Sequence, residues 1–339
     1  MTLELDRLVA GYRNGPVLHD VSLTVADREL LTVLGTSGSG KTTLLRTVAG
    51  LHRPDSGRIT LNGRDVTRER PERRRIGLVP QEGALFGHLT VAQNVGFGLR
   101  GTSWPVRSRP GRVRELLELT GLEDLPDRMP HELSGGQRQR VALARALAPE
   151  PEVVLLDEPF AALDSSLRAG LRAQVRAALR ESGATAVLIT HDQDEALSIS
   201  DRVAVLSEGR VVQAGTPREL YRRPRTLWLA GFVGDALILP GRTDGRSIVT
   251  VLGRLEHDPA AAGDATAVVR PEQLTIGAAA AAGVTATVEA VEYFGHDQLI
   301  HLRLADGTPA LARTTGDAVA TVGARVGVRV TGPVHVIDD

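Results

Sequence analysis

Cysteine is absent from the sequence, and aromatic residues make up only 3% of the chain. The lack of cysteine excludes disulfide bonds and thiolate metal sites. No apolar run approaches the ~18 residues that a transmembrane helix needs, so we expect no membrane-spanning helix. The opening residues, MTLELDR, include two acids and no apolar stretch, so we also expect no secretory signal there.

Charge is nearly balanced overall but unevenly distributed. The chain has 339 residues and a formal net charge of -1, and this length suggests two domains. Residues 1–232 hold 32 basic and 28 acidic side chains, whereas residues 233–339 hold 8 basic and 13 acidic ones. Helical patterns dominate before Val233, and short runs of Val, Ile, Leu and Thr follow it. We therefore predict domains 1–232 and 233–339.

Strand and helix patterns alternate in the first domain, which predicts an α/β fold with a mainly parallel sheet. Three apolar runs are predicted as buried strands: Leu30–Leu34, Val153–Leu156 and Ala186–Ile189. Residues 82–150 are predicted as a largely helical subdomain. Three residues begin capping-box spacings and are predicted helix starts: Thr90, Ser134 and Asp192.

A glycine-rich loop follows the first of these strands and precedes a predicted helix that ends at Gly50. Its pattern, Gly, four residues, Gly, Lys and Thr, is typical of a phosphate-binding loop. Glycines let the main chain wrap a phosphate, and the N–H groups of the helix start face it. An ordinary Gly/Ser turn is the alternative, but the flanking strand and helix favour the phosphate site. The predicted nucleotide-binding residues are Gly35, Thr36, Ser37, Gly38, Ser39, Gly40, Lys41, Thr42 and Thr43.

Lys41 is the only lysine among the 40 basic residues of the chain. Its ammonium is a compact charge on a flexible stem, which suits contact with β- and γ-phosphates better than the planar fork of arginine does. The loop alone indicates nucleotide binding and leaves a kinase, a GTPase and a transport ATPase open.

Two acids, Asp157 and Glu158, follow the second predicted strand. Ligands of open α/β sheets bind at the carboxyl ends of the strands. Asp157 is therefore expected to hold Mg²⁺, with the hydroxyl of Thr42 as a further ligand. Glu158 is expected to orient or deprotonate an attacking water. Two exposed acids at a strand end are the alternative, which the phosphate loop makes less favoured.

Residues 133–137 read Leu-Ser-Gly-Gly-Gln, and with this motif the sequence resembles the ATP-binding subunits of ABC transporters. Ser134 suits a helix N-cap, and the two following glycines leave main-chain N–H groups open, which makes a second anion site. The resemblance implies a head-to-tail homodimer in which each ATP contacts the phosphate loop of one subunit and this motif of the other. The residues assigned to the motif are Ser134, Gly135, Gly136 and Gln137.

Further residues match the motifs of that family in order. The resemblance implies that Tyr12 stacks on adenine and that Gln81 contacts Mg²⁺ and the attacking water. It also implies that Asp164 links the sites of the two subunits and that His191 contacts the γ-phosphate. Structural roles for Tyr12 and His191 are the alternatives. Thr36 and Ala161 stand where many relatives carry proline and serine, and neither departure replaces a group assigned to chemistry.

The resemblance implies that the chain hydrolyses ATP to power a membrane transporter. Glu158 would position the water. Charge on the transferred phosphoryl would be stabilised by Lys41, Gln81, His191, Mg²⁺ and the opposing Ser134. The metal would be held by Thr42, Gln81 and Asp157. Loss of the γ-phosphate would reopen the dimer and thereby drive the membrane subunits.

Two surfaces outside the ATP site are candidates for partners. Leu85 and Phe86 form an apolar pair flanked by glycines, which the resemblance assigns to docking of a membrane permease; packing into the helical subdomain is the alternative. A predicted helix over residues 167–180 has arginines four residues apart on one face, which favours a solvated face over a nucleic-acid surface.

The C-terminal domain is predicted to be all-β. Asp244-Gly245 and Asp306-Gly307 are typical of hairpin turns, and the Arg270-Pro271-Glu272 stretch and Val291–Arg303 resemble the OB-like module of ABC importers. Its negative charge and few aromatics argue against nucleic acid. We expect a regulatory or dimer-stabilising module, with a plain scaffold as the alternative.

The resemblance places the chain on the cytoplasmic face of the membrane, bound to permease subunits and served indirectly by an extracytoplasmic solute-binding protein. Val-Pro-Gln-Glu and Gly-His-Leu-Thr-Val favour cargo of ferric iron or a quaternary amine, with polyamine, thiamine and sulfate as alternatives. Two other classes stay open: a non-transport ABC ATPase acting on nucleic acid or ribosomes, and a non-catalytic nucleotide switch. The absence of a long coiled-coil insertion or a second ATPase domain disfavours the first, and Glu158 with His191 disfavours the second.

Overall fold

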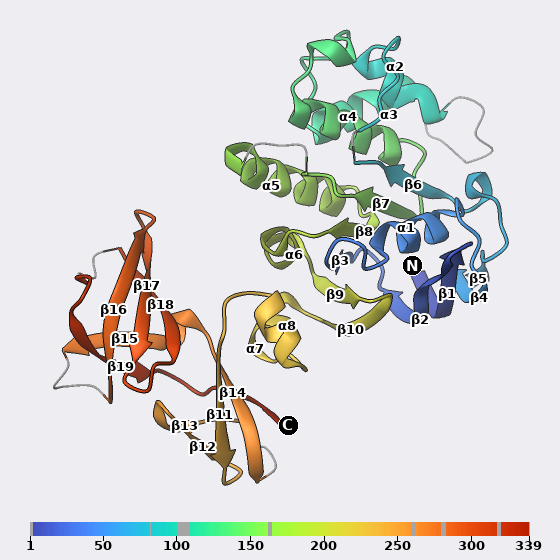
Figure 1. Ribbon diagram of the computed structural model, residues 1–339. Helices are drawn as coiled ribbons and strands as arrows, with labels where there is room; N and C mark the ends of the chain where they lie inside the picture. Colours follow the sequence, from blue (N-terminus) through green and yellow to red (C-terminus); the bar gives the residue numbers. More distant parts are fainter. Residues whose placement is uncertain are drawn as a thin grey trace. The chain divides into compact units, whose positions relative to one another are not determined.

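The computed structural model describes residues 3–81, 83–99, 109–161, 165–258, 262–278, 283–316 and 320–338. The chain forms two compact units, Met1–Pro217 and Arg218–Asp339 (Figure 1). The boundary predicted at Val233 lies inside the second unit, after helices α7 (Pro217–Arg222) and α8 (Leu227–Phe232). A short helical segment therefore belongs with the β-rich tail.

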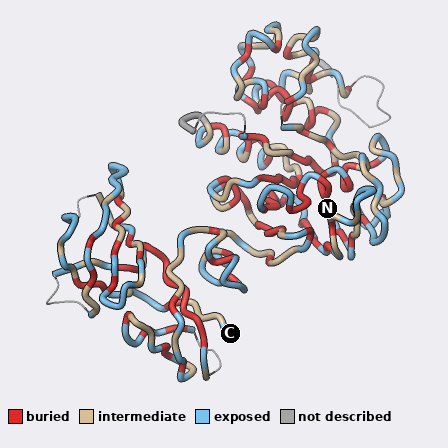
Figure 2. Tube along the Cα trace, viewed as in Figure 1, coloured by how far each residue is buried: buried red, intermediate tan, exposed pale blue. Residues whose placement is uncertain are grey.

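A six-stranded sheet in the order β10-β9-β3-β8-β7-β6 forms the centre of the first unit. Its strands in chain order are β3 (Leu30–Leu34), β6 (Ile76–Val79), β7 (Val153–Asp157), β8 (Thr185–Thr190), β9 (Arg202–Ser207) and β10 (Arg210–Gly215). All neighbours are parallel except β9 and β10. The three predicted strands are confirmed as β3, β7 and β8. Every residue of β3 and β8 is buried, as the red trace of Figure 2 marks, because helices or a second sheet cover both faces.

A four-stranded antiparallel sheet in the order β2-β1-β4-β5 covers one side of this centre. Its strands are β1 (Leu3–Tyr12), β2 (Gly15–Val25), β4 (Ser56–Leu61) and β5 (Arg64–Asp65). Helix α1 (Lys41–Ala49) packs against strands of both sheets, and Leu44, Leu45 and Val48 join their shared apolar core. The predicted end of this helix is confirmed, since Gly50 caps it at a φ of 81°.

Helices make a second core on the other side of the parallel sheet. They are α2 (Val91–Val95), α3 (Arg109–Leu119), α4 (Gly135–Leu147), α5 (Ser165–Glu181) and α6 (Gln193–Ile199). Figure 1 shows α2, α3 and α4 together as the helical subdomain. Leu116, Val141 and Leu143 are buried there in one cluster with residues of β7 and β8. None of the helices among the described residues is long and apolar enough to cross a membrane.

The predicted helix starts at Thr90 and Ser134 are confirmed as full capping boxes. Asp192 also caps its helix, because its side chain accepts a hydrogen bond of 2.9 Å from the Glu195 N–H. The carboxylate of Glu195 does not return to the cap, however. It accepts a hydrogen bond of 2.6 Å from the Thr190 hydroxyl inside the protein.

The arginines of α5 lie beside acidic and polar groups near α6. Arg168 contacts Asp192 at 3.2 Å, and Asp201 lies 3.6 Å from Arg176 and 3.2 Å from Arg180. These two carboxylates offset about half of the charge of the four arginines. The pairing therefore favours the prediction of an ordinary polar face over that of a nucleic-acid surface.

The second unit contains two five-stranded antiparallel sheets, β13-β12-β11-β14-β20 and β15-β19-β16-β17-β18. The first is made of β11 (Leu237–Thr243), β12 (Ser247–Thr250), β13 (Gly253–Glu256), β14 (Gly263–Val269) and β20 (His335–Asp338). The second is made of β15 (Leu274–Ala278), β16 (Val284–Tyr293), β17 (Asp297–Leu304), β18 (Pro309–Thr315) and β19 (Arg325–Val330). One apolar core is shared by both sheets, which confirms the predicted β-rich tail.

Both predicted hairpin turns are present in this unit. Gly245 lies between β11 and β12 at a φ of 97°, and Gly307 lies between β17 and β18 at a φ of 89°. The buried side chain of Arg270 donates hydrogen bonds to the carbonyls of Tyr221, Ala230, Gly234 and Asp235. Arg270 therefore ties the short helical segment to the sheets.

Candidate nucleotide site

Several of the predicted site residues come together at one edge of the parallel sheet. Strand β8 pairs in register with β3, so that Leu34 lies opposite Thr190, and with β7, so that Asp157 lies opposite Ile189. The carboxyl ends of these strands therefore meet at the same edge. The phosphate loop and His191 follow β3 and β8, and the acid pair stands at the end of β7, with Asp157 as its last residue.

The phosphate loop has the backbone that its glycines predict. Gly38 and Gly40 have φ angles of 81° and 104°, in the left-handed region that favours glycine. No side chain caps the start of α1, so its main-chain N–H groups keep the freedom to bind an anion. A Cβ at Gly35 would stand 2.4 Å from the carbonyl oxygen of Leu206, so this position is too crowded for a side chain.

Lys41 lies folded against the loop. Its Nζ donates hydrogen bonds of 2.8 Å to each of the carbonyls of Gly35 and Thr36, and the residue is 6% exposed. The hydroxyl of Ser39 is buried and has no hydrogen-bond partner in the described part of the chain. A positive charge and an unused donor inside a loop of this shape fit a phosphate group.

Glu158 and His191 are neighbours in space. Nδ1 of His191 lies 3.1 Å from Oε1 of Glu158, and the imidazole is more exposed than the carboxylate. The main-chain N–H of Glu158 donates to the Ile189 carbonyl over 3.0 Å, which anchors the acid to β8. Glu158 has a φ of 42°, a strained conformation of the kind that clusters at functional sites.

Neighbouring charges affect the protonation of this edge. Burial lowers the pKa of Lys41, whereas the carboxylates of Glu158 and Asp157 raise it. Burial and then the charge of Glu158 raise the pKa of Asp157, and the cations Arg46 and Lys41 oppose that shift. Arg46, an exposed residue of α1, was not predicted from the sequence, because only the fold brings it near Asp157.

The loop that carries His191 is held on both sides. The Thr190 carbonyl accepts a hydrogen bond of 3.3 Å from the Gly35 N–H, which connects it to the phosphate loop. The Thr190 hydroxyl donates to Glu195 over 2.6 Å and accepts from the Asp192 N–H over 3.0 Å. His191 is therefore fixed against the same loop that contains Lys41.

The remaining predicted residues of this chain lie nearby but make fewer contacts. Thr42 and Gln81 are exposed, the first in α1 and the second just after β6. Tyr12 ends β1 and is 50% exposed, with its ring 4.7 Å from that of His52. Asp164 lies outside the described residues.

The Ser134 motif starts α4 and is not part of this cluster. Ser134 is exposed, its hydroxyl accepts from the Gln137 N–H over 3.2 Å, and its own N–H donates to the Gln137 side chain over 2.8 Å. Figure 1 shows α4 in the helical subdomain, apart from α1. A Cβ at Gly136 would meet only Leu171 at 3.9 Å, an ordinary contact. Packing inside the chain therefore does not explain the glycine.

The predicted docking pair divides between core and surface. Leu85 packs against the core of the helical subdomain. Phe86 is half-buried, and its ring lies 4.2 Å from that of Phe97 and 6.2 Å from that of His88. Phe97 is 46% exposed. Phe97 was not predicted from the sequence, although an aromatic residue between two glycines is a detectable surface signal.

The backbone of this loop is held by two side chains. Asn94 is fully buried and bonds both the N–H and the carbonyl of Phe86, at 2.9 and 3.1 Å. Arg145 donates to the carbonyls of Gly83 and Ala84, each over 3.0 Å. Half-exposed aromatic rings on a rigidly held loop are suited to binding another protein.

Comparisons with known proteins agree with this geometry. The ABC transporter family matches residues 18–161, and the TOBE domain family, whose members are OB-like β domains, matches residues 267–336. The solved structure of cbiO1 from Clostridium perfringens, described as part of the ABC transporter complex cbiONQ, is 34% identical. Its TM-score is 0.60, over 65% of this chain and 90% of that one. The dimeric post-hydrolysis structure of the ATP-binding cassette MJ0796 with ADP and Pi is 32% identical with a TM-score of 0.56, over 64% and 99% of the two chains.

Relatives match along nearly the whole length of the chain. The Fe(3+) ions import ATP-binding protein FbpC 2 of Rhodococcus jostii is 46% identical over 97% of each chain. The sulfate/thiosulfate import ATP-binding protein CysA of Bradyrhizobium diazoefficiens is 43% identical, also over 97% of each chain. The chain belongs to the ATP-binding subunits of ABC importers, and it is an ATPase with a C-terminal TOBE domain.

Proposed function

We propose that two copies of this chain hydrolyse ATP in shared sites, with Glu158 as the residue that orients and deprotonates the attacking water. The observation that supports this role best is the distance of 3.1 Å between the Glu158 carboxylate and His191, at the sheet edge that also holds Lys41. Water oxygen bonds to the γ-phosphorus, the bond to the β-phosphate oxygen breaks, and the water proton passes to Glu158.

Positive groups of the same chain stabilise the charge that develops on the phosphoryl oxygens. Lys41 exchanges its hydrogen bonds to the Gly35 and Thr36 carbonyls for phosphate oxygens. The N–H groups of the loop and of the α1 start add fixed dipoles of the same sign. His191 donates to the γ-phosphate from the loop that Thr190 joins to Gly35.

Mg²⁺ belongs to the same proposal. Thr42, Gln81 and Asp157 offer a hydroxyl, an amide and a carboxylate oxygen, and Mg²⁺ prefers oxygen ligands of this kind. When bound, the ion neutralises charge on the phosphate oxygens. Asp157 fits this role because burial and the neighbouring Glu158 carboxylate both raise its pKa. A cation bound there would offset the negative charge of both acids.

The second copy completes each site with Ser134, Gly135, Gly136 and Gln137. Support comes from the exposed start of α4 and from Gly136. A side chain at Gly136 would fit the packing of this chain, so packing does not explain the glycine. A helix start of this kind binds a phosphate group. Asp164 is assigned to the contact between the two copies, as the family resemblance implies.

The aromatic surface of Phe86, His88 and Phe97 is proposed as the docking site for the membrane permease. Because Arg145 and Asn94 hold this loop, motion of the helical subdomain passes to whatever binds the rings. Docking there places the chain on the cytoplasmic face of the membrane, with an extracytoplasmic binding protein as an indirect partner.

Ferric iron is the proposed cargo, because relatives named for Fe(3+) import match 97% of the chain at 46% identity. Sulfate is the second candidate, supported by the 43% match to a sulfate/thiosulfate subunit. Purification with the permease, followed by uptake of labelled iron and labelled sulfate into vesicles, distinguishes them. ATP-dependent iron uptake supports the proposal, and sulfate uptake alone contradicts it.

The Glu158→Gln variant tests the mechanism. It retains the size and polarity of the side chain but cannot accept the proton, so kcat should fall about 100-fold or more while ATP still binds. In the presence of ATP, the variant should also accumulate as a closed dimer, and light scattering measures this change in mass. Glu118→Gln, on the exposed surface of α3, is the matched control. A Glu158→Gln enzyme with kcat within a few-fold of wild type would refute the role.

A further inference from the structure

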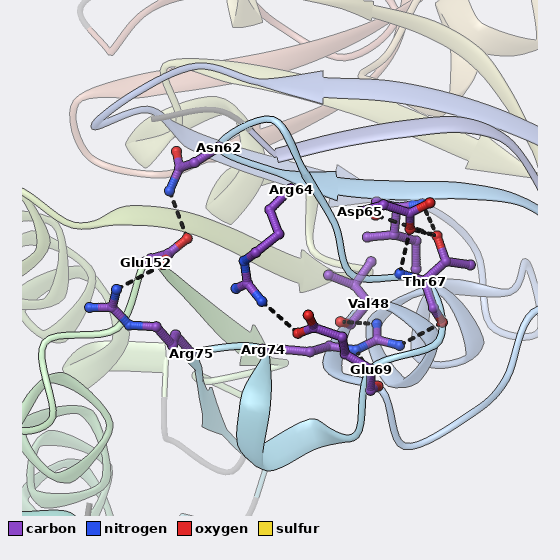
Figure 3. A network of polar contacts seen from close by, with 10 residues as sticks. Val48, Asn62, Arg64, Asp65, Thr67, Glu69, Arg74, Arg75 and Glu152 are labelled. Atoms are coloured by element: carbon purple, nitrogen blue, oxygen red, sulfur yellow. Dashed lines mark hydrogen bonds and ion pairs between the residues drawn. The ribbon is translucent and has the colours of Figure 1, made fainter. Parts of the chain in front are cut away.

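Arg74 is a buried cation that the proposed mechanism leaves unused. It lies between a short 3-10 turn, Pro71–Arg73, and strand β6, and its exposure is 2%. Among the described residues, its guanidinium donates to main-chain carbonyls alone (Figure 3). The acceptors are Thr47 at 2.9 Å, Val48 at 2.8 Å, Thr67 at 3.0 Å and Glu69 at 3.0 Å.

Two of these acceptors belong to the last turn of α1, the helix that starts at Lys41. The carbonyls of a last turn lack partners within the helix and form the negative end of its dipole. No ion pair between described residues includes Arg74. Its charge is therefore offset mainly by the helix end and by carbonyls of the 67–69 segment, and the Glu69 carboxylate adds a longer-range attraction.

Space for the guanidinium depends on Gly50. A Cβ added at Gly50 would lie 2.6 Å from Nε of Arg74, and the residue has a φ of 81°. Glycine at this position thus permits both the helix cap and the close approach of Arg74. The close contact between Gly50 and the Arg74 side chain therefore holds the end of α1 in place.

Arg74 joins two elements that lead to different residues of the proposed nucleotide site. From Arg74, β6 runs to Gln81 at about 3.3 Å per residue. The nine residues of α1 run back to Lys41 and Thr42 over about 13 Å. In the part of the chain that the structure describes, β6 is the edge strand of its sheet and pairs with β7 alone. Arg74 therefore sets α1 against β6 at the end remote from the phosphate loop.

The neighbouring residue ties β6 to β7 at the same end. Arg75 lies 3.0 Å from Glu152, and Glu152 accepts a hydrogen bond of 2.6 Å from Asn62 (Figure 3). This network fixes β6 within the sheet. Ile76 and Leu78 of β6 pack against the apolar core that includes α1, and Arg74 adds the polar link between the end of α1 and the segment that leads into β6.

We propose that Arg74 is a positioning residue for ATP hydrolysis, which sets the separation of Gln81 from Lys41 and Thr42. The inference rests on the roles proposed above for those three residues. Arginine is required because its fork spans two acceptors on α1 and two on the 67–69 segment. A lysine ammonium donates from a single point and reaches only one of the two sides.

The experiment uses the full chain and compares Arg74→Lys with Arg73→Lys, a control at an exposed neighbour. Arg74→Lys should lower kcat about 10-fold, with KM for ATP within about 3-fold of wild type, at a temperature well below its melting temperature. Arg73→Lys should leave both constants unchanged. Loss of thermal stability with an unchanged kcat would show a purely structural residue and overturn the proposal.

A double-mutant cycle with Gln81→Ala identifies the route of the effect. If Arg74 acts through Gln81, then Arg74→Lys should reduce kcat less than 2-fold in the Gln81→Ala background. Independent effects would multiply, and that result also overturns the proposal. A normal kcat in Gln81→Ala alone would instead contradict the role of Gln81. The test would then rest on whether Arg74→Lys lowers kcat while KM for ATP stays within about 3-fold of wild type. Gly50→Ala, which displaces the guanidinium, should also lower kcat and leave KM for ATP nearly unchanged.

Discussion

The imidazole of His191 and the carboxylate of Glu158 lie 3.1 Å apart, although 32 residues separate them in the chain. A contact between Nδ1 and the carboxylate selects one orientation of the ring and leaves Nε2 facing away from Glu158. The pair thus orients one group for the water and another for the phosphate. This arrangement resembles the way a base and its orienting partner are held in other hydrolases.

His191→Ala should reduce kcat about 100-fold, because it removes a donor to the transferred phosphoryl and the partner that orients Glu158. ATP binding should change little, since Lys41 and the loop N–H groups remain. Steady-state hydrolysis and equilibrium binding of a fluorescent ATP analogue measure the two effects. His131→Ala, on the exposed surface of the helical subdomain, provides the control. Equal losses in binding and in kcat would contradict a role in the chemical step.

Phe86→Asp should abolish transport while the ATPase of the isolated subunit stays within about 2-fold of wild type. The substitution puts a charge into the aromatic surface of Phe86 and Phe97, far along the chain from Lys41 and Glu158. Uptake into vesicles and hydrolysis by the isolated chain are compared. Val249→Asp, at an exposed apolar residue of the second unit, serves as control. Parallel loss of both activities would mean that the loop serves the ATPase fold and not docking.

Glu195→Gln should weaken the pH dependence of stability. Burial raises the pKa of Glu195, although the hydrogen bond from Thr190 opposes the shift. The folded state therefore binds a proton that the unfolded chain releases, so this contribution is complete below the ordinary glutamate pKa and is lost as pH rises through the raised value.

Urea denaturation of wild type and Glu195→Gln at pH 4.5 and pH 8 measures this contribution. The wild-type free energy of unfolding should fall more than that of the variant, by on the order of 1 kcal/mol. The Glu219→Gln variant, on short helix α7, controls for the loss of one carboxylate. Identical changes with pH in wild type and Glu195→Gln would contradict the prediction.

Local pattern predicted those parts of the site that a single segment builds. The phosphate loop and the capping boxes at Thr90 and Ser134 depend on residues within a few positions, so their geometry is contained in the sequence. The apolar runs also predicted where the buried strands end. Those ends place Asp157 and His191 at one edge of the sheet.

Long-range contacts could not be predicted in this way. Arg74 stands among three consecutive arginines, and only the fold shows that it alone is buried against α1. Glu195 has the spacing of a capping box, but the Thr190 hydroxyl competes for its carboxylate. The helices before Val233 belong with the tail because Arg270 binds their carbonyls, a contact between residues about 40 positions apart.

Because the chain has a single lysine, reagents that modify side-chain amines have one target. Apart from the α-amino terminus, the only primary amine is the Nζ of Lys41, which is buried against two carbonyls of its own loop. Any reagent or modifying enzyme that acylates lysine thus has one side-chain target, and reaching it means opening the phosphate loop. The stoichiometry of side-chain acylation can therefore not exceed one per chain, and a bound nucleotide that engages Lys41 should protect it.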